Sequence, residues 1–399
     1  LGGARRHAPV MRREADGSRL LWPDPPALLA LNEAETERAA PWCRIVGGRP
    51  APRGALSAPN SVHITLTDRC TAGCGQCTLP TGPGHIDADL DLLRATLGEL
   101  AALGVFEIVL GGGDVLVSDH LMSALDLIGE HHMVAHVSTA GYGLTESQAT
   151  QLAHRCGQVN IAFDGLHATY ASVRGVDRSA EALRAMRLLR EAGARFGAST
   201  TLTSTNVDTL SEMARILGPL EPVEWRWLRP KPGSSTRASF RRRHPDHDQL
   251  GSLWPAALQI QARHPIPIRF DCAFFPFLAM HGVPHDYLRR LGVRGCSGGF
   301  SLLARTAEGS WAPCPSEANA VAGEPTSVWH NDLTIREWRD HGNAPPQPCG
   351  TCSYSELCRG GCRVIASHVR GHPNAPDPWC PAVVASAGDP ASDIDERAS

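Results

Sequence analysis

Short runs of β-branched and other apolar residues alternate with helical repeats from residue 61 onward. The strand-like runs are 61–67, 106–110, 134–139, 158–164, 196–203 and 223–229. Between the first two runs, Leu90, Leu93, Leu97 and Leu100 recur at three and four residues, which predicts a helix with one apolar face. Strands that alternate with such helices are typical of parallel β/α units. The pattern therefore predicts an α/β fold.

The six expected strands are too few for a closed eight-stranded barrel. We therefore predict an open, partial (β/α)6 barrel of TIM type over residues 58–235, with its site at the C-terminal ends of the strands. Residues 1–57 form an extension rich in Pro and Arg, in which Asp16 and Gly17 suggest a hairpin turn. Further on we expect a connecting region at 236–295, a Cys-rich domain at 296–383 and a disordered tail at 384–399.

Composition narrows the class of protein. The 399-residue chain has a net charge of -3, which gives no general attraction to nucleic acid or to an acidic membrane. It shows no signal-peptide pattern and no apolar run near the roughly 20 residues that span a bilayer, so we expect a cytoplasmic protein. The single lysine is Lys231. For the run from Arg241 to Arg243 we expect a solvated loop, and the alternative is a site that holds an acidic peptide.

Thirteen cysteines are present, an odd number that fits poorly with full disulfide pairing and better with metal binding. Cys70, Cys74 and Cys77 lie in the stretch "CTAGCGQC", directly after the first expected strand. A cubane iron-sulfur cluster has four irons, so three thiolates leave one iron open. An open coordination position is typical of a catalytic metal centre. The alternative is a zinc or structural cluster site with a fourth ligand elsewhere in the chain.

The spacing and place of these cysteines resemble those of the radical S-adenosylmethionine (SAM) superfamily. The resemblance implies that the open iron of a [4Fe-4S] cluster binds SAM. One electron then cleaves SAM to a 5'-deoxyadenosyl radical, which takes a hydrogen atom from the substrate. No general base can be identified from the sequence, and hydrogen abstraction needs none.

Four further stretches resemble SAM-binding motifs of this superfamily: "LGGGDVL", "VSTAG", "IAFDG" and the pair Arg174-Gly175. By this resemblance, the SAM-binding residues are Gly112, Gly113, Asp114, Ser138, Thr139, Asp164 and Arg174. The chain departs from the family pattern at Gln76, Asp114, Val115, Ala140 and Ala162, and these positions put individual SAM contacts in question.

The C-terminal part contains seven regularly spaced cysteines. They are Cys296, Cys314, Cys349, Cys352, Cys358, Cys362 and Cys380. This spacing resembles the SPASM extension of radical SAM enzymes that modify peptides and proteins, and it implies two auxiliary clusters of [4Fe-4S] type. By resemblance, one cluster is held by Cys349, Cys352, Cys358 and Cys380. The other is held by Cys296, Cys314 and Cys362, with its fourth position unassigned.

Cys272 is a candidate for that fourth position, and the alternative is a buried apolar thiol. Cys43 and Cys156 have no partner spacing and are interpreted as packing residues. A zinc ribbon formed by Cys349, Cys352, Cys358 and Cys362 is the alternative to the SPASM interpretation.

The preferred hypothesis is a maturase that modifies a ribosomally made precursor peptide by a crosslink, a thioether or an epimerised centre. Two alternatives remain: an enzyme like the haem-pathway radical decarboxylases, and a non-catalytic iron-sulfur or zinc scaffold. Sulfatase-maturing members carry a catalytic aspartate where this chain has Pro315, which disfavours that activity. The segment "RREADGSRLLWPDPPALLALNEAE" resembles a shortened leader-peptide recognition segment, with a simple edge hairpin as the alternative.

The resemblance also implies partners. Besides the precursor peptide, we expect an electron donor such as flavodoxin or ferredoxin, and a separate peptide-recognition protein is a further candidate. Nucleic acid and membrane are not expected as partners.

Overall fold

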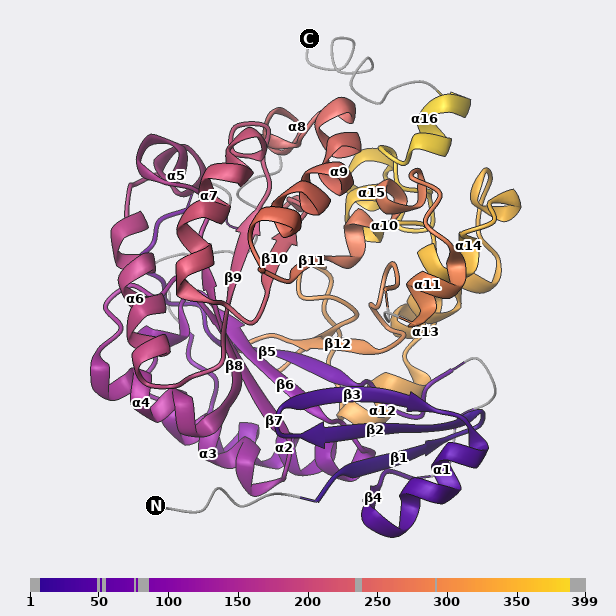
Figure 1. The fold of residues 1–399 in the computed structure, drawn as a ribbon. Coiled ribbons are helices and arrows are strands. Elements are labelled where there is room, and N and C mark those ends of the chain that lie inside the picture. Colours follow the sequence, from indigo (N-terminus) through magenta and orange to yellow (C-terminus); the bar gives the residue numbers. More distant parts are fainter. Residues whose placement is uncertain are drawn as a thin grey trace.

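The computed structural model describes residues 8–48, 51, 55–74, 77, 86–233, 239–290 and 293–387. A nine-stranded sheet with the order β11-β10-β9-β8-β7-β6-β5-β12-β13 forms the centre of the molecule (Figure 1). A separate four-stranded sheet carries the N-terminal residues, and the C-terminal third is mostly short helices and turns.

Six neighbouring parallel strands confirm the predicted β/α pattern. They are β5 (Ser61–Thr67), β6 (Glu107–Gly112), β7 (Val134–Thr139), β8 (Cys156–Ala162), β9 (Phe196–Thr201) and β10 (Trp225–Leu228). The helices that connect or follow them are α2 (Leu90–Leu103), α3 (Leu121–Glu130), α4 (Glu146–Arg155), α5 (His167–Arg174), α6 (Ser179–Glu191) and α7 (Leu210–Leu217). Three-residue 3-10 turns, η2 (Val115–Val117), η3 (Val207–Thr209) and η4 (Gly218–Leu220), complete the connections.

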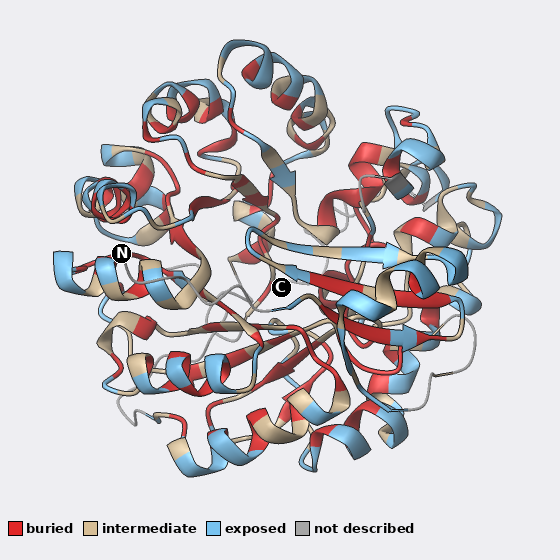
Figure 2. Ribbon diagram, turned by 60° about the horizontal axis from the view of Figure 1, so that its bottom comes forward, coloured by how far each residue is buried: buried red, intermediate tan, exposed pale blue. Residues whose placement is uncertain are grey.

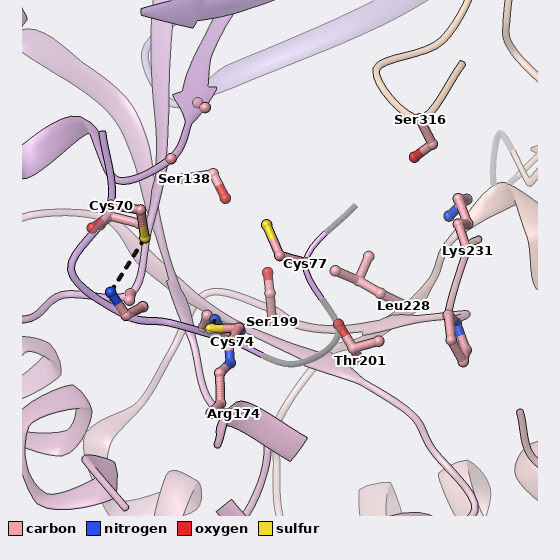
Figure 3. A pocket seen from close by; sticks show the side chains of 18 of the residues that line it. Cys70, Cys74, Cys77, Ser138, Arg174, Ser199, Thr201, Leu228, Lys231 and Ser316 are labelled. Atoms are coloured by element: carbon pink, nitrogen blue, oxygen red, sulfur yellow. Dashed lines mark hydrogen bonds between the residues drawn. The ribbon is translucent and has the colours of Figure 1, made fainter. Parts of the chain in front are cut away.

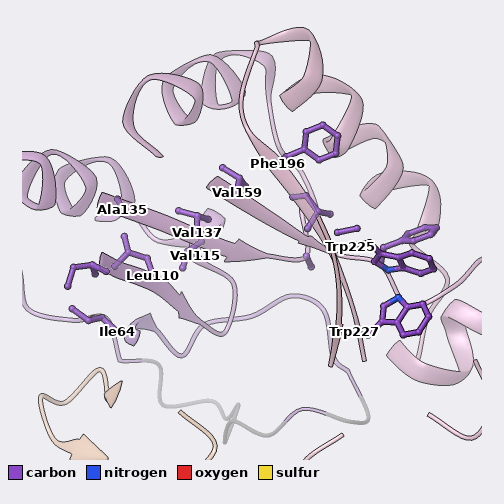
Figure 4. Close-up of a cluster of buried hydrophobic side chains, with 14 of the residues drawn as sticks. Ile64, Leu110, Val115, Ala135, Val137, Val159, Phe196, Trp225 and Trp227 are labelled. Carbon is purple, nitrogen blue, oxygen red and sulfur yellow. The ribbon is translucent and has the colours of Figure 1, made fainter. Parts of the chain in front are cut away.

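The core lies between this sheet and the helices outside it. Leu93, Leu97 and Leu100 of α2 are fully buried, as their spacing predicts. Apolar side chains from successive strands, such as Val137 and Val159, meet in one cluster (Figure 4). Figure 2 shows buried residues along the strands and exposed residues on the outer faces of the helices. Burial of this kind contributes about 25 cal/mol per Å² of apolar surface.

The sheet extends beyond the six predicted strands at both ends. At one end, β11 (Ile268–Phe270) from the expected connecting region pairs in parallel with β10. At the other end, β12 (Leu302–Arg305) from the Cys-rich region pairs in parallel with β5, and β13 (Trp311–Ala312) pairs antiparallel with β12. The sheet is therefore built partly from residues that were assigned to the connecting and Cys-rich regions.

The N-terminal extension is larger than an edge hairpin. It contains β1 (Val10–Glu14), β2 (Gly17–Pro23), β3 (Pro26–Leu31), α1 (Glu33–Ala39), η1 (Ala40–Trp42) and β4 (Arg44–Val46), with the sheet order β3-β2-β1-β4. Glu14 pairs with Gly17, so the predicted hairpin is present but turns at residues 15 and 16, one position early. Arg12 joins this sheet to the barrel because its Nη1 donates to the carbonyls of Pro59 (3.1 Å) and Gly104 (2.8 Å).

The remaining chain is short helices and turns. They are α8 (Phe240–Arg243), α9 (His247–Arg263), η5 (Cys272–Phe274), α10 (Phe275–Ala279), α11 (His285–Arg290), α12 (Pro325–Asn331), α13 (Leu333–Asp340), η6 (His341–Asn343), η7 (Cys349–Thr351), α14 (Ser355–Cys358), α15 (Arg363–Arg370) and α16 (Pro381–Ala387). Helix α16 continues past the expected start of a disordered tail at 384, because Pro381 begins a run of helix-compatible residues whose first turn bonds to the Cys380 carbonyl. The rest of that tail, 388–399, lies outside the described residues. No helix in the described ranges is long and apolar enough to cross a bilayer.

Candidate functional site

A cavity of about 320 Å³ lies where strands β6 to β10 end. Cys70, Cys74 and Cys77, from the loop after β5, all line it (Figure 3). The C-terminal ends of parallel strands are the usual place for a site in this fold, because the loops that follow the strands converge there. The structure thus brings the three predicted cysteines together where the strand pattern places the site.

Local backbone geometry holds the cysteine loop. Gly73 has a φ of +61°, which a glycine adopts at little cost, and it lets the chain turn before Cys74. The Cys77 N–H donates to the Cys74 carbonyl (3.2 Å), and the Ala72 N–H donates to Cys70 Sγ (3.4 Å). The predicted departure at Gln76 lies outside the described residues.

The set of donors fits an iron-sulfur cluster with an open iron. The residues that line the cavity include three thiols but, over the described ranges, no His, Asp or Glu. No three His, Cys, Asp or Glu side chains in those ranges lie close enough to share a single metal ion. A cluster places each thiolate on a different iron, so its ligands stand further apart than those of one ion. Burial raises the pKa of Cys70, so a bound cation is needed to keep this thiol ionised.

Gly112 and Gly113 line the cavity, as predicted, and they also let two loops approach closely. A Cβ on Gly112 would overlap the Thr67 carbonyl, and a Cβ on Gly113 would overlap the Arg69 carbonyl. The Gly113 N–H donates to the Thr67 carbonyl (2.7 Å). These glycines therefore fix the cysteine loop against the end of β6.

Asp114 does not line the cavity, in contrast to its predicted contact with SAM. Its side chain is only 2% exposed, and its carboxylate accepts from Thr139 Oγ1 and from the Ala140 N–H (3.3 Å). Burial raises the pKa of Asp114, although the hydrogen bond from Thr139 opposes that rise. Asp114 thus fixes the C-terminal end of β7, where Ser138 and Thr139 line the cavity.

Asp164 has a similar supporting place. It is fully buried, outside the cavity lining, and accepts from Arg174 Nε and the Thr201 N–H (2.6 Å). Arg174 lines the cavity, and its Nη1 donates to Cys74 Sγ (3.4 Å). Burial alone would lower the pKa of Arg174, but the charges of Asp164 and Cys74 raise it above its ordinary value. Asp164 therefore orients an arginine that reaches the cysteine loop.

Several cavity residues were not predicted from the sequence. They are Ser199, Thr201, Arg229, Lys231, Arg243 and Ser316. Most of these residues stand at or just beyond the ends of β9 and β10, a position that could have marked them as candidates. Ser316 could not be found in this way, because it comes from the Cys-rich region. The solvated loop predicted for residues 241–243 is wrong: Phe240–Arg243 is a short helix, and Arg243 points into the site because α8 packs against the C-terminal region.

A second, smaller cavity of about 30 Å³ is lined by Cys349, Cys352, Cys358 and Cys380. These are the four residues that the resemblance to the SPASM extension grouped as one cluster site. A tight turn brings the first two together, since the Cys352 N–H donates to the Cys349 carbonyl (3.1 Å). Burial, with the nearby Cys380 and Cys352 thiols, raises the pKa of Cys349 to about 11.

A third group of cysteines lies near Lys231 and the buried ion pair of Arg229 and Asp377. Asp377 accepts from the Cys362 N–H (3.0 Å), while Arg229 Nη1 donates to the Ala273 carbonyl (3.1 Å) beside Cys272. Burial raises the pKa values of Cys272, Cys314 and Cys362, and the charge of Lys231 opposes that rise in all three. Cys296 lies close enough to Cys272 and Cys314 to interact with both, so the group comprises Cys272, Cys296, Cys314 and Cys362.

The two unassigned cysteines make no such group. Cys43 Sγ donates to the Ala39 carbonyl (3.2 Å) in the N-terminal extension. Cys156 begins β8, where burial raises its pKa to about 12.

The sequence is similar to a known protein family and to several named relatives. Residues 64–217 match the model of the Radical SAM superfamily. The mycofactocin maturase MftC of Mycobacterium tuberculosis is 28% identical over 341 residues, covering 82% of this chain and 83% of the relative. A PqqA peptide cyclase of Streptomyces rochei is 27% identical over 350 residues, covering 82% and 90%.

Among solved structures, SuiB of Streptococcus suis bound to S-adenosylmethionine superposes with a TM-score of 0.74 at 15% identity, covering 95% of this chain and 99% of SuiB. SuiB has also been solved with its precursor peptide SuiA. At this level of identity the likeness shows a shared fold.

Proposed function

We propose that this chain, whose residues 64–217 match the Radical SAM superfamily model, is an enzyme that modifies a ribosomally made precursor peptide. A [4Fe-4S] cluster held by Cys70, Cys74 and Cys77 would supply the electron for reductive cleavage of SAM, and this cleavage would provide the radical chemistry for hydrogen abstraction from the peptide. Relatives named as a peptide cyclase and a maturase, and the SuiB structure with a precursor peptide, support this substrate class.

The observation that carries the proposal is the convergence of Cys70, Cys74 and Cys77 on one cavity at the ends of the barrel strands. These three thiols would hold the cluster. The backbone of Gly112 and Gly113 and the side chains of Ser138, Thr139 and Arg174 would hold SAM, since all five line the same cavity. Asp114 and Asp164 would act through Thr139 and Arg174 rather than by direct contact.

The remaining cysteines would hold two auxiliary clusters. The cavity lined by Cys349, Cys352, Cys358 and Cys380 supports one of them. The group around Arg229 supports the other, held by Cys296, Cys314 and Cys362 with Cys272 as the fourth ligand.

Iron analysis tests this cluster assignment. Three [4Fe-4S] clusters correspond to about twelve iron atoms per chain. A Cys272→Ala variant should change the paramagnetic resonance spectrum of one auxiliary cluster. An unchanged spectrum would assign Cys272 to packing.

The N-terminal four-stranded sheet is a candidate contact for the peptide. Its edge strand β3 pairs on one side only, with β2, and Leu29 on β3 is 46% exposed. An edge strand offers unpaired backbone groups to an extended peptide. A flavodoxin or ferredoxin would supply the electrons, and a separate recognition protein would be dispensable if this sheet binds the peptide.

Anaerobic reconstitution followed by reduction with dithionite tests the activity. We expect the reconstituted protein to form 5'-deoxyadenosine from SAM and to change the mass of a peptide encoded near its gene. Replacing Cys70, Cys74 or Cys77 with Ala should abolish both, whereas Cys43→Ala should retain them. Zinc without iron in the purified protein would favour a scaffold, and a mass change in a tetrapyrrole but in no peptide would favour a haem-pathway enzyme.

A further inference from the structure

The cavity has a strongly cationic lining. Arg174, Arg229, Lys231 and Arg243 all line it, whereas no Asp or Glu within the described ranges does. A bound group of negative charge would be attracted to such a surface, and the attraction is stronger in a site shielded from water.

Three of these four cations already have carboxylate partners behind the cavity wall. Arg174 pairs with Asp164. Arg229 pairs with Asp377 through two hydrogen bonds of 2.5 and 3.1 Å. Lys231 pairs with Asp271 at 2.6 Å. These pairs neutralise three of the charges within the protein.

Arg243 differs from the other three. Within the described part of the chain it has no ion pair, and its Nη1 atom is buried without a hydrogen-bond partner. Its backbone is nevertheless fixed, because the Ser204 N–H donates to the Arg243 carbonyl (3.0 Å) and the Arg243 N–H donates to the Ser239 carbonyl (3.3 Å). A buried donor without a partner costs about 1–3 kcal/mol, and more when it is charged. The protein thus holds a guanidinium with one unpaired donor, Nη1, on a fixed stretch of backbone in the cavity wall.

Arg243 belongs to the part of the cavity that the C-terminal region completes. Phe240, on the same short helix, packs edge-to-face on Trp379 (5.9 Å between ring centres) and on His368 (5.4 Å). Lys231 and Ser316, which also come from the later part of the chain, lie across the cavity from Cys70 and Ser138 (Figure 3). Arg243 therefore stands on a helix that packs against the C-terminal region, and this helix is a different segment from the cysteine loop and the glycine turn proposed to hold SAM.

We propose that Arg243 binds a carboxylate of the peptide substrate and so places the reacting residue in the cavity. The guanidinium presents two parallel N–H groups that match the two oxygens of a carboxylate. A peptide offers this group at its C-terminus and on Asp and Glu side chains. This inference rests on the proposed function, since it names a chemical feature of that peptide.

Binding in the absence of reductant tests the inference separately from catalysis. The probe is the peptide encoded near the gene, synthesised in four forms. The first is the unmodified free acid, and the second has its C-terminus amidated. The third has its Asp and Glu residues changed to Asn and Gln, and the fourth carries both changes. Each form carries a fluorophore at its N-terminus, and its affinity for the reconstituted enzyme with SAM is measured by anisotropy. The variants are Arg243→Gln, Arg243→Lys and, as a matched control on the same helix, the exposed Arg242→Gln.

For the wild type and Arg242→Gln, we expect removal of the bound carboxylate to weaken affinity roughly 10- to 100-fold. A loss of affinity in the amide form identifies the C-terminal carboxylate as the bound group. A loss in the form with Asn and Gln identifies a side-chain carboxylate. In Arg243→Gln the charged and neutral forms should bind alike, and Arg243→Lys should restore part of the difference. Iron content and melting temperature should be unchanged in Arg243→Gln.

Three results would overturn the inference. One is equal affinity of all four forms for the wild type, or no binding of any form. Another is an equal loss for charged and neutral forms in Arg243→Gln. The third is a raised KM for SAM in the peptide-free formation of 5'-deoxyadenosine by Arg243→Gln, which would assign Arg243 to SAM itself. Failure of the enzyme to form 5'-deoxyadenosine or to modify the peptide would count against the proposed function and leave these affinities readable.

Discussion

His341 is a buried histidine whose neutral form the fold requires. It is 7% exposed, and its Nε2 atom has no hydrogen-bond partner among the described residues. Burial, and then the charges of Arg363 and Arg359, lower its pKa to about 4. Since the unfolded chain binds this proton near pH 6.5, stability should fall as the pH falls from about 6.5 to about 4.

We predict that His341→Gln reduces this acid sensitivity by on the order of 2 kcal/mol between pH 6.5 and 4. Urea unfolding at several pH values measures the effect as the difference between variant and wild type. The exposed His154→Gln is the matched control variant. Parallel curves for the wild type and His341→Gln would show that His341 does not titrate in this range.

Single residues also mark where sequence reasoning reaches its limit. The motifs single out Gly112, Ser138 and Arg174, and all three line the cavity because loops that follow parallel strands converge; their contact with SAM stays a prediction. They did not show that Asp114 and Asp164 face inward. That orientation depends on partners distant in the chain, such as Thr139 for Asp114, and no local pattern encodes it.

The turn between α14 and α15 brings Cys358 and Cys362 to their two separate groups. Arg359, Gly360 and Gly361 all have left-handed φ values, +58°, +82° and +79°. A Cβ on Gly361 would also overlap the Asp377 side chain, whereas a Cβ on Gly371, at φ +77°, would meet nothing within 4 Å. Gly361 and Gly371 therefore share a left-handed backbone, but only Gly361 lacks room for a side chain.

We predict that Gly371→Ala costs about 1 kcal/mol from the left-handed backbone alone. Gly361→Ala should cost about 2–4 kcal/mol, because Asp377 must move as well. It should also lower the iron content, since Asp377 accepts the Cys362 N–H. Melting temperature and iron analysis measure both effects. Equal losses in the two variants would mean that the contact with Asp377 relaxes freely.

Elements were predictable where their signal is local and repeated. Strands β5 to β10 each carry a β-rich run followed by a helical repeat, and all six are present. The strands β11 and β12, three and four residues long, were missed because runs this short give too little sequence pattern to mark a strand. Their pairing is also non-local: Leu303 of β12 pairs with Val62 of β5.

The ion pair of Arg229 and Asp377 connects the end of β10 to the C-terminal region. Arg229 follows β10, and Asp377 precedes Cys380, yet both side chains are fully buried. Asp377 also accepts from the Cys362 N–H (3.0 Å) and the Trp379 N–H (3.1 Å). Loss of its charge would leave a buried arginine uncompensated, and breaking such a pair typically costs 3–5 kcal/mol.

We therefore predict that Asp377→Asn lowers the free energy of unfolding by about 3–5 kcal/mol, measured by urea unfolding of the reconstituted protein. Glu37→Gln removes the partner of Arg13 in an exposed pair and should cost less than about 1 kcal/mol. Because Arg229 lines the cavity and Asp377 contacts the turn before α15, Asp377→Asn should melt the barrel and the C-terminal region in one transition at a lower temperature. Two separate transitions, with the barrel unaffected, would show that the shared sheet and not this ion pair couples them.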